Sequence, residues 1–155
     1  MEDNNIKILF RFHSDILDEE TVETMWALPV DIEKGLYQIK NIPFYVPSIA
    51  TEDIVFAEYD SDEERLTYRE TIEYSDNSTV RVVIMNDSIQ IETVRKLFNE
   101  LGCPSEKLNR KYFAMEIPEN VRYKKIKDIL ADMEQKEELS YNESCLSDKH
   151  REEIE

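Results

Sequence analysis

Residues 78–102 read STVRVVIMNDSIQIETVRKLFNELG, and the change of hydrophobic period inside this stretch decides the fold. Its first part has the period-two alternation of a strand, with apolar side chains at Val80, Val82 and Ile84. Its second part has the spacing of an amphipathic helix, with apolar residues at Ile91, Val94, Leu97 and Leu101. We predict an N-cap at Asp87 with Gln90 in the capping-box position, and a helix end at Gly102. A strand that starts near Thr79 is therefore followed by a helix.

The rest of the second half continues this alternation of strands and helices. We expect a short irregular strand at 103–108, because Pro104 lacks the N–H that a central strand needs. A clearer strand is expected at 111–117, and the last strand at 139–145 closes the unit. The two helices between these strands are expected near 88–101 and 120–135. This order, β-α-β-β-α-β, is the ferredoxin-like arrangement.

The first half is predicted to contain strands alone. Five segments are rich in alternating, β-branched or aromatic residues: 6–13, 21–28, 36–39, 54–59 and 66–74. Pro29 is expected to end the second of these strands. The fourth and fifth should form a hairpin around the acidic turn at 60–64. Several short strands separated by turn residues favour a small antiparallel barrel or a strongly curled sheet.

These patterns give an α+β chain with three parts. We predict an acidic, barrel-like antiparallel β unit at 1–78 and a ferredoxin-like unit at 79–146. A charged tail at 147–155 is expected to fray. In the first unit we expect Trp26 and Phe44 to fill the core, and Asn41 to hydrogen-bond the backbone of a turn.

The charge of the chain is strongly acidic and unevenly distributed. The 155 residues include 35 acidic and 19 basic side chains, for a formal net charge of -16. Residues 1–78 hold 19 acidic and 6 basic side chains, a net -13, whereas residues 79–155 hold 16 and 13, a net -3. Such a first half repels nucleic acids and anionic membranes, and it accelerates encounter with a basic protein. We therefore predict a basic protein partner, with no nucleic-acid or membrane partner.

The residues that common catalytic and metal motifs require are scarce. The chain has two glycines, so a Walker A loop, a dinucleotide-binding fingerprint and a nucleophile elbow are excluded in their standard forms. Its two histidines, His13 and His150, and its two cysteines are too dispersed for a zinc-ligand spacing. The 60–64 turn resembles the start of a calcium loop, but Arg65 replaces the required glycine. We expect no cofactor, no metal, no catalytic residues and hence no enzyme activity.

The first residues, the apolar runs and the cysteines bear on the cellular location of the protein. The first residues, MEDNN, are acidic and lack the basic and apolar regions of a signal peptide. No apolar run approaches the roughly 20 residues that a membrane span needs. Two cysteines, Cys103 and Cys145, are too few for a disulfide scaffold and fit a reducing compartment. These features predict a cytoplasmic location.

Several short stretches carry a resemblance to a known family. They are Glu23-Thr24-Met25-Trp26-Ala27, Asn41-Ile42-Pro43-Phe44, Glu52-Asp53-Ile54-Val55, Ser78-Thr79-Val80-Arg81-Val82, Leu101-Gly102-Cys103, Leu139-Ser140-Tyr141 and Cys145-Leu146. In order and spacing they resemble the uncharacterised bacterial family called domain of unknown function 4265, over roughly residues 6–146. Glu52 and the pair Asp76-Asn77 depart from the small turn residues and the Ser-Gly turn that are common there. The resemblance implies no catalytic residue, and it implies a small acidic bacterial protein of a kind often encoded beside toxins.

Charge, folded character and missing catalytic motifs together predict a binding function. We expect an immunity protein that neutralises a basic antibacterial toxin, a nuclease, by covering its cationic surface. The alternative is a small regulatory or ligand-binding module without catalytic activity. The expected electrostatic contacts and aromatic anchors are Asp15, Asp18, Glu19, Glu20, Asp60, Asp62, Glu63, Glu64, Tyr45 and Tyr59.

Overall fold

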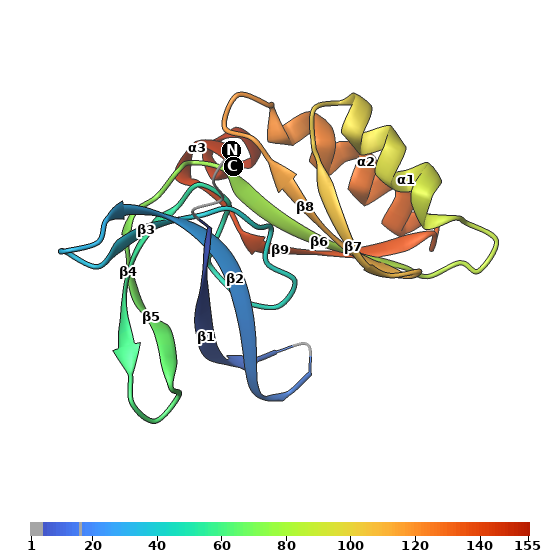
Figure 1. Ribbon diagram of the computed structural model, residues 1–155. Coiled ribbons are helices and arrows are strands. Elements are labelled where there is room, and N and C mark those ends of the chain that lie inside the picture. The colour runs from blue at the N-terminus through green and yellow to red at the C-terminus, as the bar shows by residue number, and fades with distance from the viewer. Residues whose placement is uncertain (1–4, 16) are drawn as a thin grey trace. The chain divides into compact units, whose positions relative to one another are not determined.

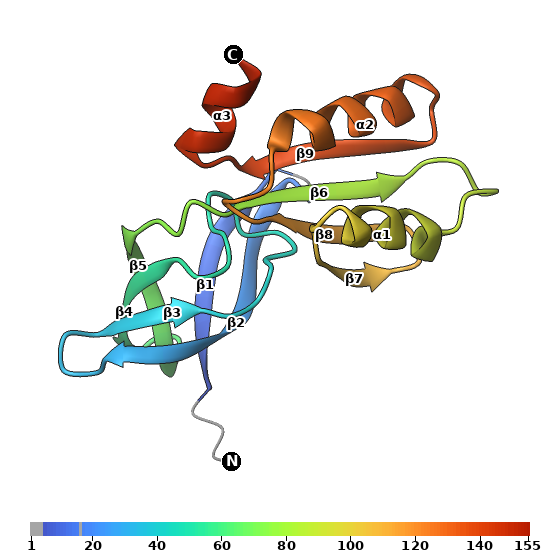
Figure 2. The ribbon, with the colours of Figure 1, turned by 90° about the horizontal axis from the view of Figure 1, so that it is seen from above.

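The computed structural model describes residues 5–15 and 17–155, and it divides into two compact units, 1–75 and 76–155. Within the described residues the chain is α+β, with nine strands in two sheets and three helices (Figures 1 and 2). The first unit contains strands alone and the second contains strands with helices, as the hydrophobic periods predict. No helix in the described part of the chain is both long and apolar enough to cross a membrane.

The first unit is a closed barrel with the strand order β1-β2-β3-β4-β5. Its strands are β1 (Ile6–Ser14), β2 (Glu19–Asp31), β3 (Leu36–Ile39), β4 (Ile54–Asp60) and β5 (Arg65–Glu73). Consecutive strands pair antiparallel, and β1 meets β5 in parallel at Leu9 and Thr67. An odd number of up-and-down strands gives the first and last strands the same direction, so the closing pair must be parallel.

Side chains at every second position of the strands point inward and fill the barrel. The inward side chains include Ile8, Phe10, Met25, Ala27, Ile39, Val55 and Ala57, each nearly inaccessible to solvent. The ring of Tyr68 stacks on Phe10 with a centroid separation of 4.6 Å. This core belongs to the barrel alone, so the first unit has its own hydrophobic centre.

The prediction that Trp26 fills this core is wrong. Met25 and Ala27 point inward, so alternation directs Trp26 outward, where 42% of its surface is exposed. The Nζ atom of Lys7, its antiparallel partner, lies 5.0 Å from the centre of the Trp26 ring. Phe44 is half-buried rather than central.

The prediction that Pro29 ends β2 is also wrong. The strand continues to Asp31, and Pro29 pairs with Tyr37 of β3 just before a register shift. A bulge relaxes the ladder where proline cannot donate a hydrogen bond. Asn41 bonds this strand rather than a turn, because its Oδ1 atom accepts the Trp26 N–H at 2.5 Å.

Two carboxylates hold the segment between β3 and β4. Glu23 of β2 accepts the consecutive backbone N–H groups of Phe44, Tyr45 and Val46 at 2.8 to 3.0 Å. Asp53 is almost fully buried and accepts N–H bonds from Ala50 at 3.1 Å and Ser75 at 2.9 Å. Buried carboxylates need such donors, so this segment is fastened at both ends.

The second unit has the element order β-α-β-β-α-β followed by a third helix. Its elements are β6 (Ser78–Ile84), α1 (Ile91–Glu100), β7 (Ser105–Asn109), β8 (Tyr112–Ile117), α2 (Tyr123–Gln135), β9 (Leu139–Cys145) and α3 (Asp148–Ile154). The strands form an antiparallel sheet in the order β7-β8-β6-β9. Helices α1 and α2 lie side by side on one face of this sheet (Figures 1 and 2). Val80, Val82 and Ile84 pack beneath them, with the inner residues of both helices.

The predicted start of α1 needs correction. The helix begins at Ile91 with Gln90 as its N-cap, and no side chain caps it. Asn86 forms the preceding turn instead, because its Oδ1 atom accepts the Ser88 N–H at 2.9 Å and its carbonyl accepts the Ile89 N–H. The expected N-cap, Asp87, forms an ion pair with Lys111 of the β7–β8 turn instead. On the buried face, Phe98 takes the place that the sequence pattern assigns to Leu97.

The tail does not fray, which corrects the third predicted part. Ser147 caps α3 by accepting the His150 N–H at 3.1 Å. The His150 ring is fully buried, with Nδ1 2.6 Å from the Ser78 hydroxyl oxygen and Nε2 3.0 to 3.1 Å from the carbonyls of Val121 and Pro118. Carbonyls only accept, so Nε2 carries the proton and Nδ1 accepts from Ser78. The last helix is thereby locked to β6 and to the start of α2.

We expect His150→Ala to lower the free energy of unfolding by about 2–4 kcal/mol, because it creates a cavity and leaves buried polar groups unpaired. Urea denaturation followed by circular dichroism measures this. The matched control is Lys149→Ala at the exposed neighbouring position, which should change stability by less than about 0.5 kcal/mol. Equal stability of the two variants would show that the histidine does not hold α3.

Candidate partner-binding surface

The acidic residues that the charge pattern singles out lie on two turns of the barrel. Asp15, Asp18, Glu19 and Glu20 belong to the β1–β2 turn and its flanks, and all four are exposed. Asp18 adopts a left-handed backbone conformation, with φ of 51°, and its Oδ1 atom lies 3.4 Å from Nε2 of His13. This first group therefore presents its carboxylates to solvent.

The β4–β5 turn holds the second acidic group in a defined shape. Asp60 Oδ1 accepts the backbone N–H groups of Asp62 at 2.8 Å and Glu63 at 3.0 Å. Glu64 follows with φ of 58°, and its N–H donates to the Asp60 carbonyl at 2.7 Å. A side-chain cap of this kind lets a non-glycine residue close the turn.

Two arginines neutralise part of this second group. Arg69 lies between Glu58 and Asp60, with N–O distances of 3.0 and 2.8 Å. Arg11 of β1 binds Glu63 through two nitrogens, at 2.9 and 3.3 Å. The Arg69 hydrogen bond, with the N–H groups of the turn, holds the pKa of Asp60 below its ordinary value. Asp60 and Glu63 are thus tied to the fold, in contrast to the exposed Asp62 and Glu64.

Arg11 also connects the two acidic groups. The Glu63 carboxylate is the main cause that raises the pKa of Arg11, and Glu20 from the β1–β2 hairpin adds to it. A shallow hollow of about 240 Å³ opens beside this arginine, lined by Arg11, Asp60, Asp62, Glu63, Thr67, Tyr68 and Arg69. We call the carboxylates of these two turns, taken together, the acidic turn surface.

The two expected aromatic anchors differ in accessibility. Tyr59 is 66% exposed at the end of β4, beside the second acidic turn. Tyr45 is half-buried in the segment that Glu23 holds through the Tyr45 N–H. Tyr59 therefore has the accessibility that an anchor requires. Charge-based reasoning overlooked the exposed Trp26 and Tyr74, although strand alternation at Trp26 indicated an outward side chain.

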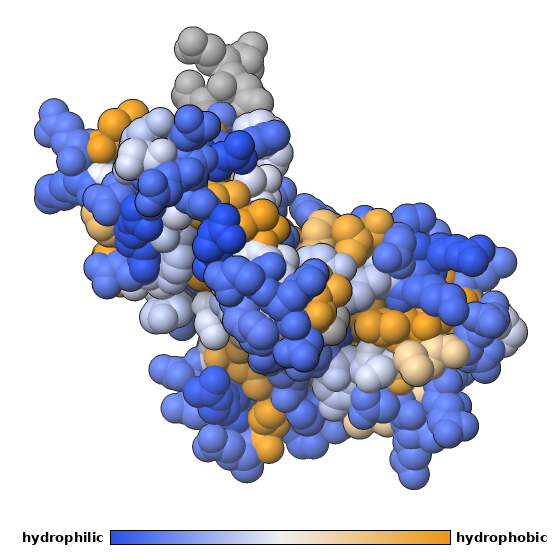
Figure 3. All heavy atoms as spheres, turned by 90° about the horizontal axis from the view of Figure 1, so that it is seen from below, coloured by the Kyte–Doolittle hydropathy of each residue, from blue (hydrophilic) through white to orange (hydrophobic). Residues whose placement is uncertain are grey.

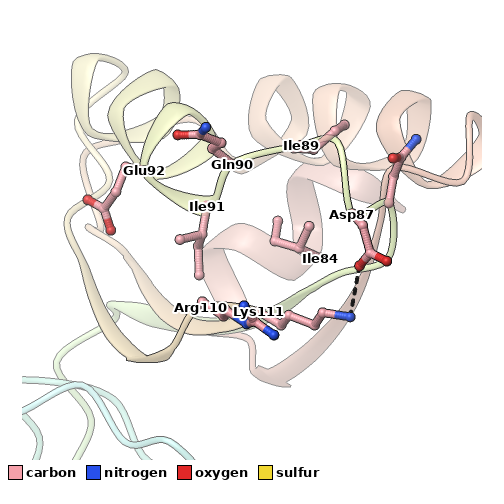
Figure 4. A pocket seen from close by; sticks show the side chains of 9 residues that line it. Ile84, Asp87, Ile89, Gln90, Ile91, Glu92, Arg110 and Lys111 are labelled. Carbon is pink, nitrogen blue, oxygen red and sulfur yellow. Dashed lines mark ion pairs between the residues drawn. The ribbon is translucent and has the colours of Figure 1, made fainter.

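A second candidate site is a hollow of about 630 Å³ in the other unit (Figure 4). It is lined by Ile84, Asn86, Asp87, Ile89, Gln90, Ile91, Glu92, Arg110 and Lys111. Figure 4 shows Arg110 and Lys111 of the β7–β8 turn opposite the first residues of α1. Lys111 pairs with Asp87 at 3.0 Å, and this hydrogen bond lowers the pKa of Asp87. Apolar side chains and both signs of charge thus meet in one hollow, which the sequence pattern did not reveal.

The described residues offer little to metal or nucleophilic chemistry. Within residues 5–15 and 17–155, no group of three or more histidine, cysteine or acidic side chains is arranged to hold a metal ion. Burial raises the pKa of the Cys103 thiol to about 12, so this thiol stays protonated at neutral pH. The buried Tyr123 hydroxyl donates to Glu143, which also binds Lys127 at 2.8 Å, and burial with this carboxylate raises the pKa of Tyr123. These groups serve packing and pairing.

The Asp60–Arg69 pair gives a direct test of the turn geometry. We expect Arg69→Gln to raise the pKa of Asp60 toward its ordinary value of 3.8, because the main cause of its depression is removed. A depressed pKa in the folded state contributes stability above the unfolded pKa and loses it as pH falls through the folded pKa. NMR titration of the carboxyl carbon measures the change. Arg65 is exposed and lies opposite Asp60 in the hairpin, yet it does not contribute to the depressed pKa. Arg65→Gln should therefore leave the Asp60 titration unaltered, and equal shifts in both variants would contradict the Asp60–Arg69 pair.

Comparison with known proteins supports one family. The profile of Domain of unknown function (DUF4265) matches residues 23–141. A solved structure of a hypothetical protein from Neisseria gonorrhoeae is similar, with 22% sequence identity, a TM-score of 0.80, and coverage of 95% of this chain and 99% of that chain. At this identity the likeness shows the fold alone. No curated protein matches the sequence. The chain belongs to the DUF4265 family, as the short stretches at 23–27, 41–44 and 78–82 predict.

Proposed function

We propose that this member of the DUF4265 family is an immunity protein, which binds and neutralises a basic antibacterial toxin of the nuclease class. The observation that supports the proposal most is the charge of the barrel unit. Residues 1–75 hold 18 acidic and 6 basic side chains, a net -12, on a folded scaffold with its own core. The proposed action is binding without catalysis, in the cytoplasm, where a nuclease toxin would meet its nucleic acid.

Internal pairing leaves a defined set of carboxylates for a partner. In the described part of the chain, no basic side chain lies within salt-bridge distance of Asp15, Glu19, Glu20, Asp62 or Glu64, and all five are exposed. Asp60 and Glu63 act differently, because their arginines hold the turn in shape. The proposed contact residues therefore divide into free carboxylates and the paired ones that position them.

The chemistry of a nuclease explains why such a surface would neutralise it. A nuclease binds polyphosphate, so its active cleft carries lysine and arginine side chains. Exposed carboxylates are complementary to that cleft and compete with phosphate for the same donors. Complementary potentials accelerate association, and the effect weakens as salt screens the charges. Tyr59 lies next to Asp60 at the start of the β4–β5 turn and is accessible to a partner.

The second unit enters the proposal as a scaffold of ferredoxin-like type. Its order of elements, β6-α1-β7-β8-α2-β9, matches that arrangement, and its strand order β7-β8-β6-β9 agrees with two crossing β-α-β connections. Residues 76–155 hold 17 acidic and 13 basic side chains, a net -4. The weaker charge supports a smaller part in attracting a basic partner.

Charge removal at the free carboxylates tests this function. The barrel variant carries Asp15→Asn, Glu19→Gln, Asp62→Asn and Glu64→Gln, and the control carries Glu100→Gln, Glu119→Gln, Glu137→Gln and Glu152→Gln at exposed positions of the other unit. We expect the barrel variant to associate with its toxin domain about ten-fold more slowly at low salt, with the difference shrinking above about 0.15 M salt. The control should change the rate far less.

The partner for this test comes from co-expression. Each basic toxin domain encoded beside members of the family is produced with this chain, and rescue of bacterial growth identifies the neutralised toxin. Stopped-flow measurements at two salt concentrations then give the association rates. Failure to rescue growth from every such toxin would refute the immunity proposal. Equal slowing in both quadruple variants would refute the assignment of the contact to the barrel.

The hollow beside α1 favours a second candidate function, a small regulatory or ligand-binding module. Its volume of about 630 Å³ is within the range of small-molecule sites, and its lining combines isoleucines with a few charged side chains. In the described residues Arg110 forms no salt bridge, so its guanidinium is available to a carboxylate ligand.

A screen of small carboxylic acids by NMR tests this second function. Binding would shift the amide signals of the residues that line the hollow, and Arg110→Glu should weaken the binding at least about ten-fold by replacing attraction with repulsion. Lys96→Glu makes the same charge change on an exposed part of α1 and serves as the control. If no acid causes a saturable shift at millimolar concentrations, the ligand-binding function is excluded.

A further inference from the structure

The outward face of β2 is unusually apolar for a solvent-facing strand. Alternation directs Val22, Thr24, Trp26, Leu28 and Val30 away from the barrel core. Val22, Trp26 and Val30 are 47%, 42% and 52% exposed, and Ile32 in the following turn is exposed as well. Outward faces of antiparallel strands are ordinarily polar. We call Val22, Trp26, Val30 and Ile32 the β2 stripe.

The β2 stripe has the length of a contact site, with the exposed Thr24 and the half-buried Leu28 between its members. Residues 22 to 30 of one strand span about 27 Å at the usual rise of a β-strand. On the face that Figure 3 shows, hydrophobic patches lie among a mostly hydrophilic surface. An apolar run rimmed by polar residues marks an interaction surface, whereas single exposed apolar residues do not.

The charges around the β2 stripe specify the partner. Glu19 and Glu20 precede the stripe, and Asp31 and Glu33 follow Val30. The bases close to it are Lys7, Lys34, Lys40 and Arg11, of which Arg11 is paired with Glu63 and Lys40 with Glu52. Carboxylates at both ends complement a basic surface. They oppose a second copy of this chain, because each barrel unit carries a net -12.

Trp26 adds a specific chemical preference. The Lys7 ammonium lies 5.0 Å from the centre of its ring, so the electron-rich face of the indole already attracts a cation. The exposed part of the ring can receive a partner arginine or lysine together with its aliphatic stem. Tryptophan is also one of the residue types enriched among binding hot spots.

We propose that the β2 stripe, centred on Trp26, anchors a basic protein surface that presents arginine or lysine beside aliphatic side chains; this rests on the proposed immunity function. The acidic turn surface attracts the partner, and the stripe holds it once bound. Steering charges act on the association rate, whereas buried apolar anchors act on the dissociation rate.

The experiment separates these two roles. Trp26→Ser should raise the dissociation constant for the neutralised toxin domain about thirty-fold or more, mainly through faster dissociation, with little salt dependence. Tyr74→Ser, at an aromatic residue outside β2 that is even more exposed than Trp26, is the control and should change the dissociation constant less than about three-fold. Val22→Ser with Val30→Ser gives a second, tryptophan-free test. Thermal unfolding verifies that each variant is folded.

A photocrosslinking arm is independent of neutralisation. Benzoylphenylalanine replaces the exposed Thr24 between Val22 and Trp26, or Glu137 as control, and each protein is irradiated with the panel of basic toxin domains. An adduct through position 24 with a basic domain, together with the Trp26→Ser loss, supports the proposal. Growth rescue that Trp26→Ser leaves intact overturns the stripe while the immunity function stands. If position 24 gives no adduct, or adducts only between copies of this chain, the β2 stripe is not a surface for a basic protein. This outcome can be scored even if no toxin is neutralised.

Discussion

The structure depends on one constraint, which is that carboxylates outnumber basic side chains. The Glu23 carboxylate shows how this is met, because it accepts the consecutive N–H groups of Phe44, Tyr45 and Val46. With 35 acidic and 19 basic side chains, the chain cannot give every carboxylate a cation. Backbone donors satisfy the inner carboxylates instead, at Glu23 and again at the buried Asp53. Both fasten the segment between β3 and β4 to the barrel, and neither carboxylate needs a lysine or arginine to do so.

The small number of basic side chains determines which carboxylates on the surface of the barrel are paired. Arg11 and Arg69 are left to pair with Glu63, Asp60 and Glu58, which hold the β4–β5 turn beside β1. The remaining exposed carboxylates of the two turns have no such partner within the described residues. In the proposed complex, a bound basic protein would supply these cations.

Much of the fold could be predicted from the sequence, because the hydrophobic periods of strands (two residues) and helices (3.6 residues) are local properties. The strands of both units and the alternation of elements after Thr79 follow from them. At Trp26 the alternation of the strand was outweighed by the size of the side chain, whereas at α1 and α3 a turn or a distant hydrogen bond overrides a local preference. The Asn86 turn delays α1 beyond the expected capping box, and α3 forms because His150 bonds Ser78, 72 positions away. At the candidate surface, charge identified the acidic turns, yet the pairing of Asp60 and Glu63 required knowing that Arg69 and Arg11 lie beside them.

The uneven charge of the two units bears on why such a surface exists. Solubility of a small domain needs a net charge of only about 2–8 in magnitude, and the unit of residues 76–155, at -4, lies in that range. The barrel unit, at -12, exceeds it, and like charges on one compact unit lower its stability. Lysine could replace several of its exposed acids without disturbing the core, because their side chains touch nothing inside the barrel. A charge that exceeds the needs of solubility and lowers the stability of the barrel unit agrees with the proposed recognition of a cationic partner.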